Sequence, residues 1–427
     1  MSHDGEVLLL DHPVTTITFD GYDAIREALF NKDLSRSFDK RTYAQGNVRD
    51  GVVSIVHGAT HRARRRVENT EFRADRLRLY ERELFPAVLE TMLDRLTVDR
   101  AVNLFELGEL LSVVLAARRA GLDHDPEDLG QLRRLVHFVD AFSQASAILD
   151  ARDPDAVRAM ARQAWADFEA EFVRPSWATR NEAVERYRRG EIGAEELPHD
   201  ILTALLAHRG SDPRLELDDD GRVVREVGTY LQGGTHTSSQ TLINALDLLF
   251  PAADRDPGLR DRVVADRLLA QRVVHETLRL RPTTPKIKRR AEADTTVAGR
   301  RIPKDALVVL DVATANRDPR LFGPDADEFN PNRPLADDVA RWALSFGGGP
   351  HQCPGRSVAG GFPVPPSFEP DDDHLFGLVA YMLQAVLRRG VRPDPDRAAV
   401  RDTRTERYTR WSEYPVLFDP PREAVPA

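Results

Sequence analysis

The sequence predicts a mainly helical protein with minor β-structure, and two observations carry that prediction. Apolar residues recur at spacings of three and four over long segments, among them 73–96, 225–250 and 266–281, which is typical of amphipathic helices. Alternating segments typical of strands are few, namely 12–19, 295–312 with a glycine turn, and 412–418. The expected class is therefore mainly α with small β-sheets.

The domain organisation follows from length and composition. A chain of 427 residues with 41% hydrophobic and 30% charged residues can bury a large core. No low-complexity linker and no repeat divides it, so we expect a single domain over residues 1–427. One compositional break, 360–373, is too rich in Gly, Pro and Asp for a helix. We expect a short helix before it, an exposed loop insertion, and a helix resuming from about His374 to Arg389.

Charge and cysteine usage exclude several classes of protein. The formal net charge of −9 argues against a general nucleic-acid-binding protein. No apolar run reaches the length of a membrane span. A single cysteine cannot form an intramolecular disulfide, and no apolar leader opens the chain, so the sequence predicts a cytoplasmic protein.

That single cysteine, Cys353, lies in the segment SFGGGPHQCPGR, residues 345–356. The glycines around it allow the backbone to approach a flat or bulky group, and Pro354 fits the first turn of a helix. A thiolate there would face N–H groups and the positive end of a helix dipole, which predicts a lowered pKa for the thiol.

Three interpretations of Cys353 follow from its residue type and surroundings. A buried lone cysteine is commonly a small apolar filler. A nucleophilic cysteine would need a nearby base, for which His351 is the candidate. A metal ligand would need a metal that accepts one protein sulfur, and haem iron does so.

The order and spacing of this segment resemble the haem-thiolate loop of the cytochrome P-450 family. The matching positions are Phe346, Gly347, Gly349, His351, Cys353 and Gly355. The resemblance implies that Cys353 is the iron ligand and that Phe346, Gly347 and His351 help to hold the haem. It also implies the cytochrome P-450 fold, a large helical domain with small β-sheets around a buried haem b (iron protoporphyrin IX).

Further motifs agree with this resemblance over most of the chain from about His61 to Cys353. HETLRLRP supplies Glu276 and Arg279, three apart on one helix face, and DEFNPNRP supplies Arg333. They resemble the family's structural triad of one glutamate and two arginines. A bare ExxR is weak evidence, whereas an ExxR followed by this arginine and this cysteine loop is strong.

The segment LQGGTHTSSQTL, residues 231–242, resembles the family's distal helix over the iron. The resemblance implies that Gly233 and Gly234 open a groove for dioxygen and that Thr237 hydrogen-bonds the bound oxygen and passes protons to it. The position that usually holds an acid is His236. Two interpretations of His236 are open: a proton relay that titrates near neutral pH, and a side chain packed behind the helix.

A basic cluster, HRARRR at 61–66, places His61 and Arg65 four residues apart on one helix face. They match the family's ligands for a haem propionate, and Arg289 and His351 are similarly implied, since charge-assisted bonds suit buried carboxylates. We expect Arg62, Arg64 and Arg66 to form a solvated face, near the surface where the family docks its acidic electron donor. His57 and His61 have the spacing of a zinc pair, but no third ligand accompanies them.

The resemblance implies a monooxygenase that uses dioxygen and electrons from separate ferredoxin and reductase proteins, in bacterial natural-product tailoring. Hydroxylation is the default outcome; coupling, nitration or desaturation on the same scaffold, and a non-catalytic haem sensor or carrier, are the alternatives. In the family, RPTTPKIKRR at 281–290 passes beside the haem. Its candidate substrate-binding residues are Thr284, Lys286, Ile287 and Lys288. A lysine in the pocket would indicate an anionic small-molecule substrate.

Overall fold

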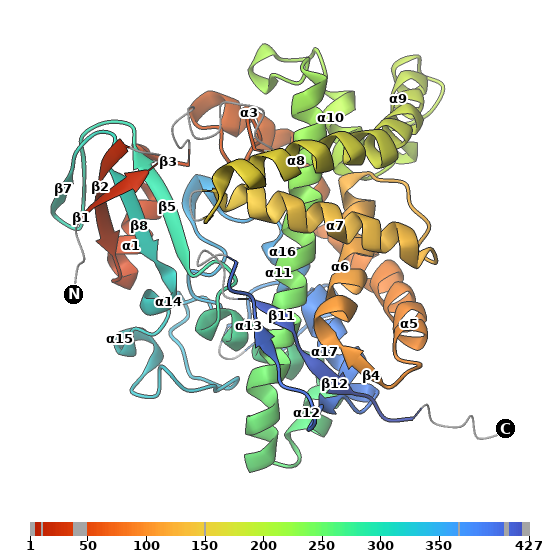
Figure 1. Cartoon of the computed structure of the whole chain (residues 1–427), viewed down its shortest axis with the longest axis vertical. Coiled ribbons are helices and arrows are strands. Elements are labelled where there is room, and N and C mark those ends of the chain that lie inside the picture. Colours follow the sequence, from red (N-terminus) through yellow and green to blue (C-terminus); the bar gives the residue numbers. More distant parts are fainter. Residues whose placement is uncertain are drawn as a thin grey trace.

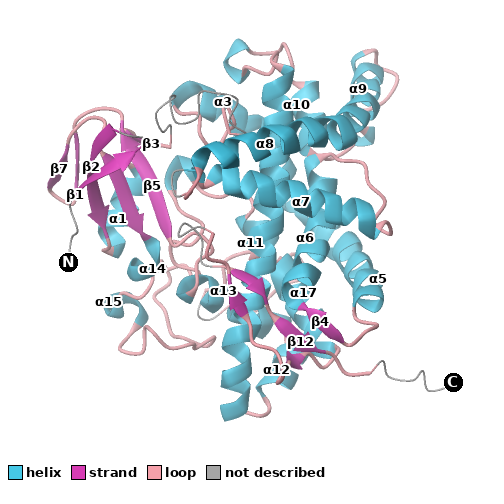
Figure 2. Ribbon diagram, in the orientation of Figure 1, coloured by secondary structure: helices cyan, strands magenta, loops and turns pink. Residues whose placement is uncertain are grey.

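The computed structural model describes residues 5–9, 12–36, 49–148, 151–365, 368–404 and 410–420. Helices dominate the described chain, and strands gather mainly into one sheet at its side (Figure 2). The predicted class, mainly α with minor β, is confirmed.

The longest helix, α11 (Asp220–Arg255), runs through the middle of the helical part of the molecule (Figure 1). The Asp219 side chain caps its first turn by accepting a hydrogen bond from the Arg222 N–H. Its main partner is α6 (Leu104–Ala120). The two backbones approach closely because small residues meet: a Cβ on Gly234 would lie 2.9 Å from Cβ of Ala116. The glycines that the sequence places in this helix therefore also serve helix packing.

Most of the remaining helices pack around α11 and share one apolar core with it, whereas α1, α14 and α15 contribute to a second core beside the sheet. The predicted helix at 73–96 is interrupted by a π-helical turn at Tyr80–Leu84, so that it forms two helices, whereas α13 matches the predicted 266–281 closely. The other helices are α1 (Tyr22–Phe30), α3 (Gly58–Glu68), α4 (Ala74–Leu79), α5 (Phe85–Leu96), α7 (Leu129–Ser146), α8 (Pro154–Phe168), α9 (Arg174–Arg188), α10 (Ile201–Ala207), α12 (Leu259–Ala265), α13 (Arg267–Leu280), α14 (Val312–Ala315), α15 (Pro319–Phe322), α16 (Arg356–Ala359) and α17 (Leu378–Arg388).

The main sheet has the strand order β1-β2-β8-β5-β3. Its strands are β1 (Gly5–Leu9), β2 (His12–Phe19), β3 (Leu34–Ser35), β5 (Lys286–Ala291) and β8 (Leu307–Asp311). β2 pairs with β8 in parallel, and the other pairs are antiparallel. Together with α1 the sheet encloses a second apolar cluster. β5 follows α13 in the chain. Its place in the sheet brings Ile287 next to Gly347 of the cysteine loop.

Short strands complete the fold and largely follow the sequence pattern. β6 (Thr295–Val297) and β7 (Arg300–Ile302) form the hairpin predicted around Gly299, where φ is +75°. The predicted strand at 412–418 forms parts of two small sheets, β10-β11 and β4-β12-β9. Their strands are β4 (Ala101–Asn103), β9 (Arg392–Pro393), β10 (Val400–Arg401), β11 (Trp411–Glu413) and β12 (Pro415–Leu417).

The segment after the cysteine loop departs from the expectation in two ways. The resumed helix, α17, begins at Leu378 and not at about His374, because Gly377 has a φ of +88° and interrupts the helix there. Within the described part of the insertion, Pro363, Pro365 and residues 369–373 are exposed, whereas Val364 is buried, as are His374 and Leu375 directly after the insertion. Gln271 of α13 fixes both ends by donating to the carbonyls of Gly360, Phe362 and Leu375, at 2.9 to 3.1 Å. Pro366 lies outside the described residues.

Candidate active site

The cysteine loop owes its shape to two glycines. Gly347 and Gly349 have φ values of +66° and +63°, a region that residues with a side chain rarely adopt. A Cβ on Gly349 would lie 2.3 Å from the carbonyl oxygen of Leu29, so the loop is pressed against α1. The Cys353 N–H closes the loop by donating to the Phe346 carbonyl at 2.9 Å. The sequence therefore holds the sulfur on a rigid backbone turn.

The prediction of a lowered thiol pKa at Cys353 is wrong for the protein without a metal. Burial raises the pKa of the thiol above its ordinary value, and this outweighs the Gly355 N–H and Arg65, which act in the opposite direction. Pro354 also does not open a helix: α16 begins at Arg356 and has four residues. A helix this short offers little dipole to a thiolate.

Basic side chains from three parts of the chain meet beside this loop, and we call this set the basic cradle: His61, Arg65, Arg289 and His351. The rings of His61 and His351 lie 4.0 Å apart between centroids. Arg65 donates to the Gln352 carbonyl at 3.1 Å, which ties α3 to the cysteine loop. Arg289 comes from β5 and is 3% exposed.

The cradle has no acidic partner within the described ranges of the chain. Burial lowers the pKa of His61 to about 4, with Arg65 adding to the effect, and lowers that of Arg289 to about 9. Burial and then His61 lower the pKa of His351 to about 2, and its Nε2 has no hydrogen-bond partner. These shifts leave the two imidazoles uncharged at neutral pH, whereas a buried guanidinium such as that of Arg289 needs a counter-charge. These four residues thus fit a group that brings carboxylates, as haem does through its propionates.

The neighbouring arginines of α3 do not all face solvent as expected. Arg62 and Arg66 are exposed, but Arg64 is fully buried. The interpretation of Arg64 as part of a solvated face is therefore wrong, because its position on α3 points it at α11, where Glu226 binds it.

The distal side of the site is the face of α11 that carries Gly233 and Thr237. Both residues are exposed, although Gln232, Thr235, His236 and Ser238 around them are buried. The Thr237 hydroxyl donates to the Gly233 carbonyl at 2.7 Å. This exposed strip in the middle of a mostly buried helix could contact a bound group. It would present the Thr237 hydroxyl and little side-chain bulk to that group.

His236 points away from this face. Its Nδ1 lies 2.5 Å from Oε2 of Glu109 on α6, and its Nε2 lies 4.0 Å from Oδ1 of Asp140 on α7. Both carboxylates come from helices packed behind α11. The structure thus places His236 among interhelical contacts, which is the packing alternative left open by the sequence.

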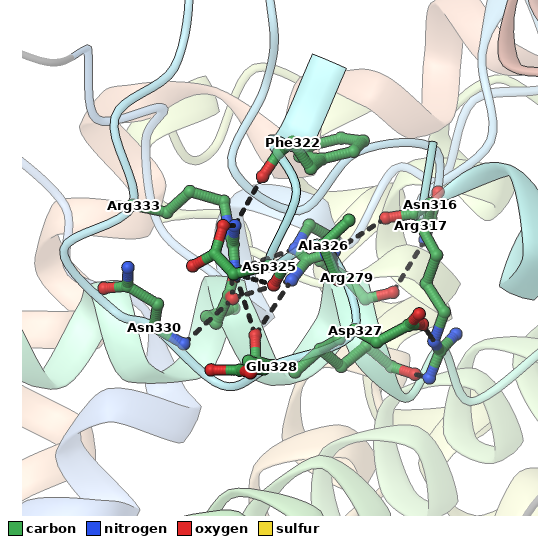
Figure 3. A network of polar contacts seen from close by, with 12 residues as sticks. Arg279, Asn316, Arg317, Phe322, Asp325, Ala326, Asp327, Glu328, Asn330 and Arg333 are labelled. Carbon is green, nitrogen blue, oxygen red and sulfur yellow. Dashed lines mark hydrogen bonds and ion pairs between the residues drawn. The ribbon is translucent and has the colours of Figure 1, made fainter. Parts of the chain in front are cut away.

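Arg279 and Arg333 lie close together in a buried network (Figure 3), and the third triad residue, Glu276, is buried with them. Arg279 binds both carboxylate oxygens of Glu276, at 2.7 and 2.8 Å, and Arg333 binds Oε1 at 3.2 Å. The arginines also donate to backbone carbonyls, those of Asn316 and Ala326 for Arg279 and those of Asp325 and Glu328 for Arg333. This network fastens the segment that leads to the cysteine loop onto α13.

Asn316 links the triad to the cysteine loop, and sequence reasoning missed it. Its Nδ2 donates to the Arg279 carbonyl and to Oγ of Ser345, at 3.1 and 2.9 Å, while its Oδ1 accepts from the Leu344 N–H. A single asparagine after a short helix carries no pattern that could have marked it. Its role follows from contacts between residues far apart in the sequence.

The candidate substrate-binding residues lie on or just before β5. Strand alternation puts Ile287 on the same face as Arg289, and a Cβ on Gly347 would lie 3.8 Å from Cδ1 of Ile287. Lys286 and Lys288 occupy the opposite face; Lys286 is exposed and Lys288 has a polar interaction of its own. Thr284 is half-buried before the strand. The geometry favours Ile287, and not an ammonium group, beside the site.

Two kinds of site are not found in the part of the chain that the structure describes. No group of three or more His, Cys, Asp or Glu side chains there is placed to hold a metal ion, so His57 and His61 have no third ligand for zinc. Nor does any described helix have the length and apolarity that crossing a membrane requires.

Comparison with known proteins agrees with this geometry. Residues 7–360 match the family described as Cytochrome P450. This chain belongs to the cytochrome P450 family. The P450 is 26% identical over 353 residues to pulcherriminic acid synthase of Bacillus subtilis (strain 168), covering 79% of this chain and 78% of that protein. It is 28% identical over 284 residues to flavonoid-6-hydroxylase of Ocimum basilicum, covering 59% of this chain and 52%, about half, of the basil protein.

Among solved structures, the P450 resembles CalO2 with a TM-score of 0.72 and 22% identity, covering 96% of this chain and 91% of CalO2. This likeness shows the fold. Membership of the family makes the chain a P450 oxidoreductase, and haem is the cofactor that this family implies.

Proposed function

We propose that this P450 is a haem-thiolate monooxygenase of the bacterial type that oxidises a small organic molecule in natural-product tailoring. The observation that carries the proposal is the open face of α11, where Thr237 presents its hydroxyl beside Gly233. A non-catalytic sensor or carrier would not need a hydroxyl at this point. Hydroxylation is the default reaction, and coupling, nitration and desaturation are alternatives on the same site.

The residues around the site fit haem b, whose iron, when bound, supplies the activation of dioxygen. Cys353 would be the sulfur ligand of the iron. The basic cradle would hold the two propionate carboxylates through charge-assisted hydrogen bonds. Phe346 and Gly347 shape the turn that holds Cys353, and the Thr237 hydroxyl lies on the exposed face of α11, where it donates to the Gly233 carbonyl. The raised thiol pKa falls when a cation binds the sulfur, because the metal stabilises the thiolate.

The roles of the distal residues differ. Gly233 leaves room and offers its carbonyl to Thr237, while Gly234 allows the close approach of α6. The contact of His236 with Glu109 supports a role in holding α11 against α6. Proton delivery by His236 stays a prediction from the sequence.

For the redox partner we propose a ferredoxin with its reductase. Arg62 and Arg66 are exposed on α3, the helix that also carries His61 and Arg65, and exposed cations there suit an acidic electron donor. The exposed tip of the insertion, 369–373, carries four acidic residues and would influence which donor is accepted. A single domain and a cytoplasmic location also stay predictions from the sequence.

The monooxygenase proposal is tested with the reconstituted holoenzyme, a ferredoxin, its reductase and a panel of small metabolites selected by their shift of the haem Soret band. We expect a product that carries one atom of isotopically labelled dioxygen. The Thr237→Ala variant is expected to consume oxygen but to form about 10²-fold less product per oxygen, because general acid–base groups typically contribute about 10²–10⁴-fold. Soret-shifting ligands that are never oxidised would favour the sensor or carrier.

The structure also allows a test of substrate charge. Binding of an aromatic acid and its methyl ester is compared in the wild type, Ile287→Ala, Lys286→Met and Lys288→Met. We expect Ile287→Ala to weaken both ligands by about tenfold, since about 1.4 kcal/mol of apolar contact is lost. The lysine variants should leave the ratio of the two affinities unchanged. Selective loss of acid binding in Lys288→Met would instead establish an anionic substrate.

A further inference from the structure

A buried cluster of charged residues joins α3 to α11, away from the cysteine loop. It consists of Arg64 and Glu68 from α3 and Glu226 and Tyr230 from α11. The two carboxylates and the guanidinium are 0% exposed. Arg64 binds Glu226 and lies 3.5 Å from Oε1 of Glu68, and the Tyr230 hydroxyl donates to Oε2 of Glu68 at 2.7 Å. We call these four residues the α3–α11 cluster.

The charges of this cluster do not balance. One guanidinium faces two carboxylates, and neither carboxylate has a second cationic partner among the ion pairs of the described residues. Two carboxylates that share one buried cation cannot both ionise without a large electrostatic cost. A proton on one of the two carboxylates would remove this cost.

The residues around the cluster do not neutralise its excess negative charge. The remaining charged groups that act on it are Arg65, the half-buried member of the basic cradle, and Arg119 of α6, which interacts with Tyr230. Two backbone bonds attach the loop before α3: the Val53 N–H donates to Glu226 at 2.8 Å, and Arg64 donates to the Gly51 carbonyl at 3.0 Å. The cluster thus holds both the loop before α3 and the last turn of α3 against α11.

We propose that the α3–α11 cluster is an alkaline-sensitive joint, in which the proton shared by Glu68 and Glu226 keeps the helix that carries His61 and Arg65 docked on the distal helix. Loss of this proton leaves an unbalanced buried charge between α3 and α11. The consequence is a looser α3 and, with it, weaker retention of a group bound by the basic cradle.

The titration of Glu68 supports the proposal. Burial, followed by the charge of Glu226, raises the pKa of Glu68 from its ordinary value of 4.5 to about 8. Between these values the unfolded chain loses the proton and the folded protein keeps it, so that stability falls as pH rises through this window. Above about pH 8 the folded protein also ionises, and the joint carries its excess charge.

The experiment follows the infrared band of a protonated carboxyl group in the holoenzyme as a function of pH. We expect the wild type to lose this band with a midpoint near pH 8 and Glu68→Gln to lack the transition. Glu226→Gln should move the midpoint to lower pH, because it removes the like charge. Tyr230→Phe should move it to higher pH, because it removes a hydrogen bond to the ionised form.

A second readout is thermal unfolding and haem transfer to an acceptor protein. The difference in melting temperature, Glu68→Gln minus wild type, should increase as the pH rises from about 4.5 to about 8. Above about pH 8, haem release should accelerate in the wild type but not in Glu68→Gln. Identical pH profiles in the wild type and Glu68→Gln, or midpoints that do not move in Glu226→Gln and Tyr230→Phe, would overturn the proposal. Neither readout depends on the reaction proposed above, so each proposal can fail separately.

Discussion

Replacing Arg279 with alanine is expected to destabilise the protein by about 3–5 kcal/mol, because it leaves part of a buried charge network without its partner. Arg279 is fully buried and makes two hydrogen bonds to Glu276 and two to the carbonyls of Asn316 and Ala326. The variant should accumulate without haem and in insoluble form. The measurement is haem content per chain together with the free energy of unfolding in urea.

The matched control is Arg262→Ala. Arg262 also binds an aspartate, Asp256, but both side chains are half exposed, so solvent screens the pair and its loss should leave the stability nearly unchanged. Arg279→Lys should fall between the two, since an ammonium keeps the charge but cannot form the forked pair with Glu276. Normal haem content in Arg279→Ala would contradict the structural role of the triad.

Replacing Cys353 with histidine is expected to abolish the spectroscopic signature of thiolate ligation. The ferrous, carbon-monoxide-bound wild type should show the red-shifted Soret band that a sulfur ligand produces, and Cys353→His should lose it. Cys353 is the sole cysteine of the chain, so no other thiol can replace it. An unshifted band in well-folded wild-type protein would refute thiolate ligation.

The control for this substitution is the stability of the apoprotein, which should not change because the backbone of the loop closes independently of the side chain. The loop is closed by the bond from the Cys353 N–H to the Phe346 carbonyl, which any side chain at position 353 leaves intact. Cys353→His should therefore keep the fold and the melting curve of the apoprotein. A variant that unfolds would show instead that the sulfur contributes to packing.

The parts of the site that could be predicted are those carried by short sequence spacings. The glycines around Cys353 imply a turn that only glycine allows, and the positive φ values of Gly347 and Gly349 agree with it. Glu276 and Arg279 are three residues apart on one helix, so their contact follows from helical geometry.

The parts that could not be predicted depend on contacts between distant segments. Glu109 and His236 are 127 positions apart, and Arg64 and Glu226 are 162 positions apart. Nothing in the local pattern of α3 distinguishes Arg64 from the exposed arginines beside it. The burial of each arginine depends on where α11 passes, and that is a property of the whole fold.

The insertion after the cysteine loop likewise has features that the local sequence predicts and features that depend on distant contacts. Its Pro, Gly and Asp content predicts a loop, but its buried ends depend on Gln271, about ninety positions earlier, as the separation of 89 between Gln271 and Gly360 shows. The helix start at Leu378 has two causes: contacts with that glutamine hold His374 and Leu375 in the loop, and the positive φ of Gly377 interrupts the helix after them.

The two ends of this insertion meet, because a Cβ on Gly377 would lie 2.4 Å from the backbone nitrogen of Gly361. The segment between α16 and α17 is therefore a closed loop, whose first and last residues lie next to each other. Lengthening such a closed loop costs little, about 0.6 kcal/mol for each doubling of its length. An electron-transfer domain could therefore be inserted at the exposed tip, residues 369–373. Such a fusion would link the domain covalently to the enzyme without changing the residues around Cys353.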